Sequence, residues 1–174
     1  MATIIGTAGN DTLIGHGGND VIDGGAGNDL LIGATGWNGI WENGRYRVER
    51  NTTPSIFANG SDTYLFGRGD GQDTVIDGDY TAGNSDTLRF KEGVAPEDVK
   101  FIRDGQDLVL AIRGTDDKVT LKQYFDEAWN GANGPYLIER IAFADGTVLS
   151  YANVQAILFA GSEEAETIIG SRAA

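Results

Sequence analysis

The sequence predicts an all-β protein built as a coil of short strands, with a β-rich region closing the C-terminal end of the coil. Three observations support this fold class. Gly-Asn-Asp recurs every nine residues near the N-terminus, each copy precedes an aliphatic residue by two positions, and longer amphipathic strands replace the pattern after residue 90. A nine-residue period of glycine, aspartate and one apolar residue matches neither a helix nor simple strand alternation, so it indicates stacked coils.

The repeat units cover residues 6–14, 15–23 and 24–32 without slippage. In each unit the first six residues form a turn, and glycines at its first and fourth positions allow backbone conformations that other residues avoid. The last three residues form a strand whose middle side chain, Leu13, Ile22 or Leu31, is predicted to point inward. One unit cannot bury that side chain alone, so the coils must stabilise one another by stacking.

The aspartate at the sixth position of each unit indicates a bound cation. Turns stacked in register bring like-charged carboxylates close together, and these repel unless a cation lies between them. Calcium fits because it accepts six to eight oxygen ligands with loose geometry, whereas magnesium requires a strict octahedron and zinc prefers Cys or His. The chain has no cysteine and one histidine.

The units match Gly-Gly-x-Gly-x-Asp-x-aliphatic-x, so the chain resembles the RTX ("repeats in toxin") family of calcium-binding nonapeptide repeats. The resemblance implies a right-handed parallel β-roll in which two nonapeptides make one coil and turns eighteen residues apart share an ion. It also implies that the earlier turn supplies its second and fourth carbonyls and its Asp, and the later turn its first and third carbonyls and its Asp. One complete calcium site would then use Thr7, Gly9, Asp11, Gly24, Ala26 and Asp29.

The same rule gives a second site that is incomplete. Its residues would be His16, Gly18, Asp20, Gly33, Thr35 and Asn38. Because Asn38 stands where the family has Asp, this site either lacks a charge or is completed from elsewhere in the chain.

Residues 37–58 depart from the repeat and are interpreted as an inserted loop or hairpin. Degenerate repeats return over residues 59–90, where Asp62, Asp73 and Asp86 each precede an inward apolar residue by two positions. If the roll resumes after the insertion, Asp62 stacks on Asp20, Asp73 on Asp29, and Asp86 on Asp62. These three aspartates, together with Gly25 and Gly27, complete the set of candidate ligands. Asp77-Gly78-Asp79 begins like an EF-hand loop but lacks the sixth-position glycine and the twelfth-position glutamate of such loops.

Residues 91–160 are predicted to form an antiparallel β-rich cap, which a solenoid needs to cover its last coil. Strands over 99–103 and 108–112 flank the turn signal Asp104-Gly105, a further strand falls within 118–125, strands over 138–143 and 148–151 flank a second turn, and 152–159 predicts a short helix. Residues 161–174 have the outline of a further repeat or of a foreign tail, which suggests a piece of a larger parent protein.

Composition restricts the classes of function. The formal net charge is −13, and residues 1–44 contain no Lys or Arg, which argues against nucleic acid or an anionic membrane as the main partner. There is no membrane-spanning apolar run, no cysteine nucleophile and no hydrolase or zinc-protease motif, so we expect no enzyme. The expected partners are calcium ions and the rest of a larger parent, and the expected state is a secreted monomer, with bacterial type I export implied by the resemblance.

One alternative function remains at this stage. The inserted segment 37–58 carries Trp37 and Trp41, and the cap carries Tyr124, Phe125 and Trp129. Exposed aromatic residues of this kind would suit a ligand-binding or adhesion module.

Overall fold

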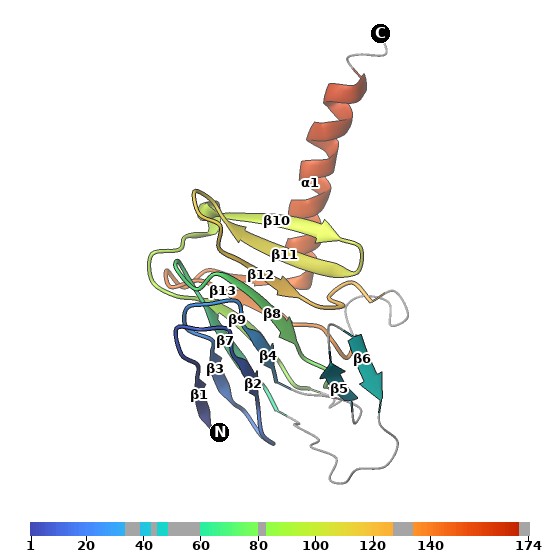
Figure 1. The fold of residues 1–174 in the computed structure, drawn as a ribbon. Coiled ribbons are helices and arrows are strands. Elements are labelled where there is room, and N and C mark those ends of the chain that lie inside the picture. Colours follow the sequence, from blue (N-terminus) through green and yellow to red (C-terminus); the bar gives the residue numbers. More distant parts are fainter. Residues whose placement is uncertain (34–38, 43–44, 49–59, 80–82, 127–133, 171–174) are drawn as a thin grey trace.

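The computed structural model describes residues 1–33, 39–42, 45–48, 60–79, 83–126 and 134–170, and gives only the backbone for 39–42, 45–48 and 162–170. Successive short strands of the repeat region alternate between two six-stranded sheets, which lie face to face (Figure 1). The first sheet has the order β1 (Thr3–Ile5), β3 (Val21–Asp23), β7 (Thr63–Phe66), β9 (Thr87–Phe90), β13 (Arg140–Ala142) and β14 (Val148–Ser150). The second has the order β10 (Val99–Asp104), β11 (Asp107–Ile112), β12 (Lys118–Leu121), β8 (Gln72–Ile76), β4 (Leu30–Ile32) and β2 (Thr12–Ile14).

Parallel pairing of every second strand confirms the predicted β-roll. β1 pairs with β3 and β2 with β4, each in parallel and with an offset of eighteen residues, as in Thr3↔Val21 and Thr12↔Leu30. After the insertion β7 pairs in parallel with β3, and β8 with β4, so the two sheets continue in the same alternation.

The core lies between the two sheets and is built from the predicted inward positions. Ile22 and Leu31 are buried, and Leu13 packs against the same cluster. The equivalent residues after the insertion, Tyr64, Val75 and Leu88, are also buried, and Phe66 and Phe90 pack edge to face beside them. Leu13 is less covered because β2 is the edge strand of its sheet, and Ile5 and Ile14 on the two edge strands are exposed.

The C-terminal region continues both sheets and closes them. β12 pairs in parallel with β8, and β13 with β9, after which β11, β10 and β14 add in antiparallel fashion. The hairpins predicted around Asp104-Gly105 and around residues 144–147 are confirmed. Gly105 has φ +63°, which places it in the left-handed region that glycine favours.

A short antiparallel hairpin interrupts the repeats, formed by β5 (Gly39–Glu42) and β6 (Arg45–Val48). Pro96–Asp98 forms one turn of 3-10 helix, η1, and α1 covers Tyr151–Gly170. The helix predicted over 152–159 is therefore present and longer than expected: residues 161–170, which have the outline of a repeat, continue it. The helix projects away from the sheets (Figure 1), and among the described residues no helix is both long and apolar enough to cross a membrane.

Candidate metal centre

A ladder of carboxylates runs along the turns that precede the strands of the first sheet. The backbone N–H of Asp20 donates to Asp62 Oδ1 at 2.7 Å, that of Asp62 to Asp86 Oδ1 at 2.8 Å, and that of Asp86 to Glu139 Oε2 at 2.7 Å. The three aspartates are buried. The predicted stacking of Asp62 on Asp20 and of Asp86 on Asp62 is confirmed, and Glu139 extends the ladder into the cap.

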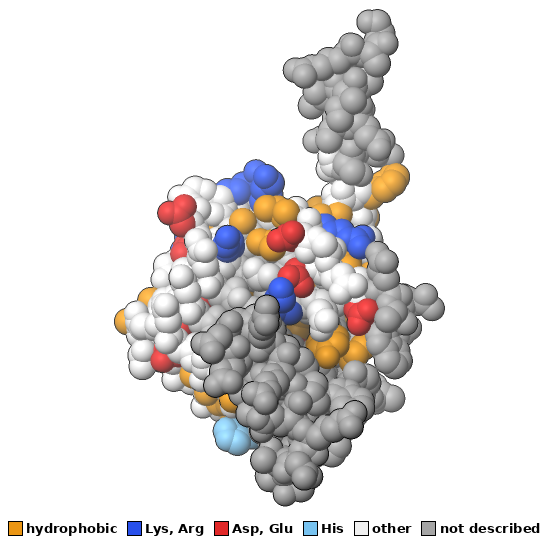
Figure 2. Space-filling view, turned by 45° about the vertical axis from the view of Figure 1, so that its right-hand side comes forward, with side chains coloured by type: hydrophobic (Ala, Val, Ile, Leu, Met, Phe, Trp, Pro, Cys, Tyr) orange, Lys and Arg blue, Asp and Glu red, His pale blue; other side chains and the backbone are white. Residues whose placement is uncertain are grey.

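A second ladder lies at the N-terminal ends of strands of the second sheet. Asp11 N–H donates to Asp29 Oδ1 at 2.8 Å, and Asp29 N–H donates to Asp73 Oδ1 at 3.0 Å, which confirms the predicted stacking of Asp73 on Asp29. The ladder ends there because Val119 of β12 is the residue opposite Asp73. Figure 2 shows only scattered acidic side chains on one face of the molecule, as expected when many of the carboxylates lie inside the turns.

The residue before each aspartate forms a further ladder that the sequence reasoning missed. Asn28 N–H donates to Asn10 Oδ1, and Gln72 N–H donates to Asn28 Oδ1, both at 2.9 Å. These bonds run from the later turn to the earlier side chain, opposite in direction to the aspartate bonds. Adjacent turns are thus held in both directions, and the recurrence of Asn, Gln or Ser before Asp was the available signal.

The complete site predicted between the turns 6–11 and 24–29 has its oxygens arranged around the glycines. A Cβ at Gly25 would lie 2.4 Å from the Thr7 carbonyl oxygen, and one at Gly27 would lie 2.7 Å from that of Gly9. A Cβ at Gly6 would lie 2.1 Å from the Gly24 carbonyl oxygen and 2.9 Å from Asp11 Oδ2. These positions therefore need glycine, because any Cβ there would clash with a carbonyl oxygen of the stacked turn.

The two aspartates of this pair differ in their surroundings. Asp11 Oδ2 accepts hydrogen bonds from the backbone N–H and the hydroxyl of Thr7, and the backbone bond chiefly lowers the pKa of this exposed carboxyl. Asp29 Oδ2 is buried and has no hydrogen-bond partner among the described residues. A buried charged oxygen without a partner is costly, so Asp29 fits a bound cation. Ala26, the remaining predicted ligand of this pair, is exposed.

The turn that stacks on the turn of Asp20 comes from beyond the insertion. Asp62 is the stacked neighbour of Asp20, and a Cβ at Gly60 would lie 2.4 Å from the Gly18 carbonyl oxygen. The turn of Asp62 therefore takes the place expected for the turn of Asn38. Thr35 and Asn38 lie outside the described residues.

Gly33 and His16, which belong to the same predicted site, have clear positions. Gly33 faces the carboxylate and phenol of the next turn, since a Cβ there would lie 2.7 Å from Asp62 Oδ2 and 1.8 Å from Tyr64 Oη. The backbone N–H of His16 donates to Asp20 Oδ2 at 2.6 Å, while its side chain is exposed, as the pale blue group in Figure 2 shows.

The turns of Asp29 and Asp73 form a further candidate site. Gly27 and Gly71 make a parallel bridge, and a Cβ at Gly71 would lie 2.1 Å from the Gly27 carbonyl oxygen. Asp73 Oδ2, like Asp29 Oδ2, is buried and without a hydrogen-bond partner among the described residues. Burial chiefly, and the Asp29 charge in addition, raises the pKa of Asp73 to about 7. The donor set of carboxylate and carbonyl oxygens suits calcium.

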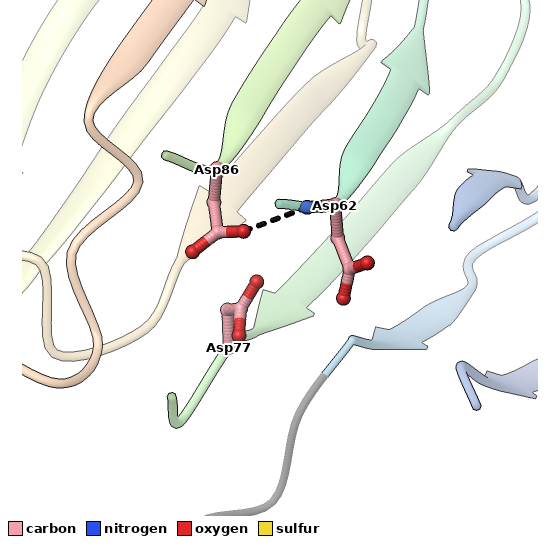
Figure 3. Close-up of side chains that lie close together, drawn as sticks. All are labelled: Asp62, Asp77 and Asp86. Atoms are coloured by element: carbon pink, nitrogen blue, oxygen red, sulfur yellow. Dashed lines mark hydrogen bonds between the residues drawn. The ribbon is translucent and has the colours of Figure 1, made fainter. Parts of the chain in front are cut away.

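Asp77 is a candidate ligand that the repeat rule does not include. It lies directly after β8, and one of its carboxylate oxygens lies within 4.8 Å of oxygens of Asp62 and Asp86 (Figure 3). Burial chiefly, and the charges of neighbouring carboxylates in addition, raise the pKa of Asp62 to about 6 and that of Asp86 to about 8. The signal in the sequence was an aspartate at the turn position where the regular units have glycine.

One pair of carboxylates already has a cation from the chain. Lys91 Nζ lies 2.7 Å from Asp23 Oδ1 and 2.9 Å from Asp70 Oδ2. Lys91 follows β9, Asp23 ends β3, and Asp70 lies in the turn before β8, so the ammonium group joins the two sheets. Sequence reasoning missed this contact because the three residues are far apart along the chain.

The aromatic residues considered for a binding surface have a different role where the structure describes them. Tyr124 and Phe125 are 1% and 2% exposed and pack against each other and Tyr151. The prediction that these two lie on an exposed binding face is wrong, because they belong to the core of the cap. Trp37 and Trp129 lie outside the described residues, as does the side chain of Trp41.

Comparison with known families supports the assignment made from this geometry. Residues 3–36 match the family model described as RTX calcium-binding nonapeptide repeat (4 copies). The repeats are RTX calcium-binding repeats. This confirms the resemblance noted in the sequence, and the RTX units coincide with the turns that carry Asp11, Asp20 and Asp29. Residues 107–153 match the haemolysin-type calcium binding protein related domain, so the first repeats and most of the cap fall into two separate matches.

A similar protein is the iron-regulated protein FrpA of Neisseria meningitidis serogroup C, which is 38% identical over 96 residues. The aligned part covers 55% of this chain and 8% of that protein. The chain therefore spans only a small part of the length of this relative.

Proposed function

We propose that the chain is a calcium-binding module that folds on binding calcium outside the cell, as part of a larger secreted protein such as a toxin, enzyme or adhesin. The observation that carries the proposal is the pair of carboxylate ladders, in which Asp20, Asp29, Asp62, Asp73 and Asp86 are buried one above another. Buried like charges destabilise the folded chain unless a cation is bound.

The energy available from calcium is large enough to control folding. A site with a dissociation constant of ~10⁻⁴ M stabilises the folded state by about 1.4 kcal/mol at ~1 mM calcium. Three such sites contribute about 4 kcal/mol, a large part of the net stability of a small domain. At calcium concentrations far below the dissociation constant the contribution vanishes, so the chain would stay unfolded inside a cell and fold after export.

The position of the module within a larger protein is supported by two observations. The similar meningococcal protein is much longer than the aligned segment. The edge strands β1 and β2 also expose Ile5 and Ile14, at 69% and 46%. Apolar residues on an open strand edge suit a further coil stacked against them.

Circular dichroism during a calcium titration tests the proposal. The chain should show little β-structure in chelator and gain it cooperatively as calcium rises toward millimolar concentrations, while magnesium at the same concentration should have much less effect. A chain that is equally folded in chelator and in millimolar calcium would refute the proposal.

A further inference from the structure

Three carboxylates from both sheets meet at the end of the roll nearest the cap. Asp62 and Asp86 precede β7 and β9 in the first sheet, whereas Asp77 follows β8 in the second and points between them (Figure 3). One oxygen of each lies within 4.8 Å of the others, and the three residues are between 1% and 3% exposed. The cluster is therefore enclosed by the fold.

Asp77 occupies a turn position at which the regular coils cannot hold a side chain. Gly15 follows β2, Gly33 follows β4, and Asp77 follows β8, so the three residues stack in neighbouring coils. A Cβ at Gly15 would lie 2.8 Å from the Gly33 carbonyl oxygen, and one at Gly33 would meet Tyr64 Oη. Asp77 therefore places a carboxylate at a position where the regular coils have glycine. The nonapeptide rule does not include a metal ligand at this position.

The hydrogen bonds of the cluster orient Asp77 and leave one of its oxygens open. Tyr64 Oη donates to Asp77 Oδ2 at 2.8 Å, and Asp77 Oδ1 is buried without a hydrogen-bond partner among the described residues. Asp62 N–H donates to Asp86 Oδ1 at 2.8 Å, which fixes the spacing of the two stacked residues.

Among the described residues no Lys or Arg forms an ion pair with these three carboxylates, and the N-terminal ammonium, which lies 4.0 Å from Asp20 Oδ1, favours the charged form of Asp62 only slightly. Lys91, Arg68 and Lys122 form their ion pairs with other carboxylates. Three buried carboxylates without a counter-charge are strongly unfavourable, because each must be desolvated next to two like charges. A divalent cation between them would remove most of this cost.

We propose that Asp62, Asp77 and Asp86 bind one calcium ion, and that Tyr64 holds Asp77 in position for it. The proposal rests on the calcium binding proposed above and adds a site built from three side-chain carboxylates, where a regular pair of turns supplies two. Calcium affinity rises with the number of charged ligands and with the rigidity of the site. This ion should therefore be the last to leave as calcium is removed.

Counting bound ions in the full chain tests the proposal. Native mass spectrometry and calorimetric calcium titration should show one ion fewer, and loss of the tightest binding step, in Asp77→Asn and in Asp77→Gly. Asp77→Gly restores the residue of the regular turns, and the exposed Asp104→Asn is the matched control that should keep every ion. Unchanged ion number and affinity in both Asp77 variants would overturn the proposal.

Tyr64→Phe separates the positioning role from binding itself. The ring keeps its place in the core while the hydrogen bond to Asp77 is lost, so the number of ions should stay the same and the dissociation constant of the tightest site should rise about tenfold. An unchanged dissociation constant would remove Tyr64 from the proposal.

A crystal structure of the wild-type chain with calcium decides the case if the Asp77 variants do not fold. An ion at 2.3–2.6 Å from oxygens of all three residues is expected. Ions in the repeat turns together with an empty cluster would overturn this inference alone, whereas a chain that folds without any calcium would overturn the proposed function as well.

Discussion

The Asp29→Asn variant should keep the fold and the hydrogen bond between neighbouring turns. Its stability should nevertheless respond much less to calcium than that of the wild-type chain. Asp29 lies between Asp11 and Asp73 in the second-sheet ladder. The amide oxygen of Asn can still accept the Asp11 N–H, but the charge and the unpartnered Oδ2 are lost. The ions on both sides of residue 29 should therefore no longer bind at millimolar calcium, whereas Asp11→Asn at the end of the ladder should remove one.

The magnitude follows from linkage. Where calcium exceeds the dissociation constant, each ion that binds only the folded state adds about 1.4 kcal/mol to the free energy of unfolding per tenfold rise in calcium. Asp29→Asn should reduce this slope by about 2.7 kcal/mol per tenfold, Asp11→Asn by about half as much, and the exposed Asp104→Asn by nothing.

Urea unfolding followed by circular dichroism at ~1 mM and ~10 mM calcium measures the slope. A wild-type slope in Asp29→Asn, together with a stability loss that does not depend on calcium, would refute the reasoning. It would mean that Asp29 acts only as an acceptor for the neighbouring turn.

Three further predictions address pH, the internal cation and the glycines. The pKa values of Asp62, Asp73 and Asp86 are raised to about 6, 7 and 8 in the folded chain, so the contribution of these three carboxyls to the stability of the calcium-free fold is lost as pH rises from about 4 to about 8. Chelator-treated protein that is more folded at pH 8 than at pH 5 would contradict this. Lys91→Met leaves Asp23 and Asp70 without their ammonium partner, whose side chain is 31% exposed. Urea unfolding should show that the free energy of unfolding falls by about 2 kcal/mol, by the same amount at ~1 and at ~10 mM calcium. Gly25→Ala places a Cβ against the Thr7 carbonyl oxygen, so it should lower the free energy of unfolding by about 3 kcal/mol and reduce its dependence on calcium. Gly69→Ala has a similar positive φ but open space around the Cβ, so it should lower the free energy of unfolding by about 1 kcal/mol and leave the calcium dependence unchanged. Equal effects in the two variants would contradict the assigned geometry.

Local periodicity predicted much of the fold because each unit repeats the same physical problem. An apolar residue two positions after each aspartate must be buried, so Ile22, Tyr64 and Leu88 were placed correctly even where the spacing of the units changes. The stacking of Asp62 on Asp20 was predicted correctly because successive strands alternate between the two sheets, and the insertion does not change this alternation.

Contacts between residues of different turn positions could not be predicted in this way. Asp77 follows β8 directly, and it becomes a candidate ligand only because β8 pairs with β4, which brings Asp77 close to Asp62. Lys91 is equally unpredictable, since its partners end β3 and precede β8. Tyr124 and Phe125 were misjudged because aromatic residues in a loop-rich segment look the same in the sequence whether a helix covers them or not.

The chain balances only part of the negative charge of the roll. Lys91 neutralises Asp23 and Asp70, the N-terminal ammonium lies 4.0 Å from Asp20 Oδ1, and Asp117 accepts the backbone N–H groups of Gly69 and Gly71 at 2.8 and 3.0 Å. Residues 1–44 have no Lys or Arg, and the described ion pairs of the first coils involve Asp20 and Asp23 but neither Asp11 nor Asp29, which are left to the proposed calcium. The strands β12 and β13 of the cap pair in parallel with β8 and β9, so the cap covers the last strand of the roll in each sheet. The proposed calcium sites therefore lie both in the first coils and beside the cap, where Asp62, Asp77 and Asp86 meet.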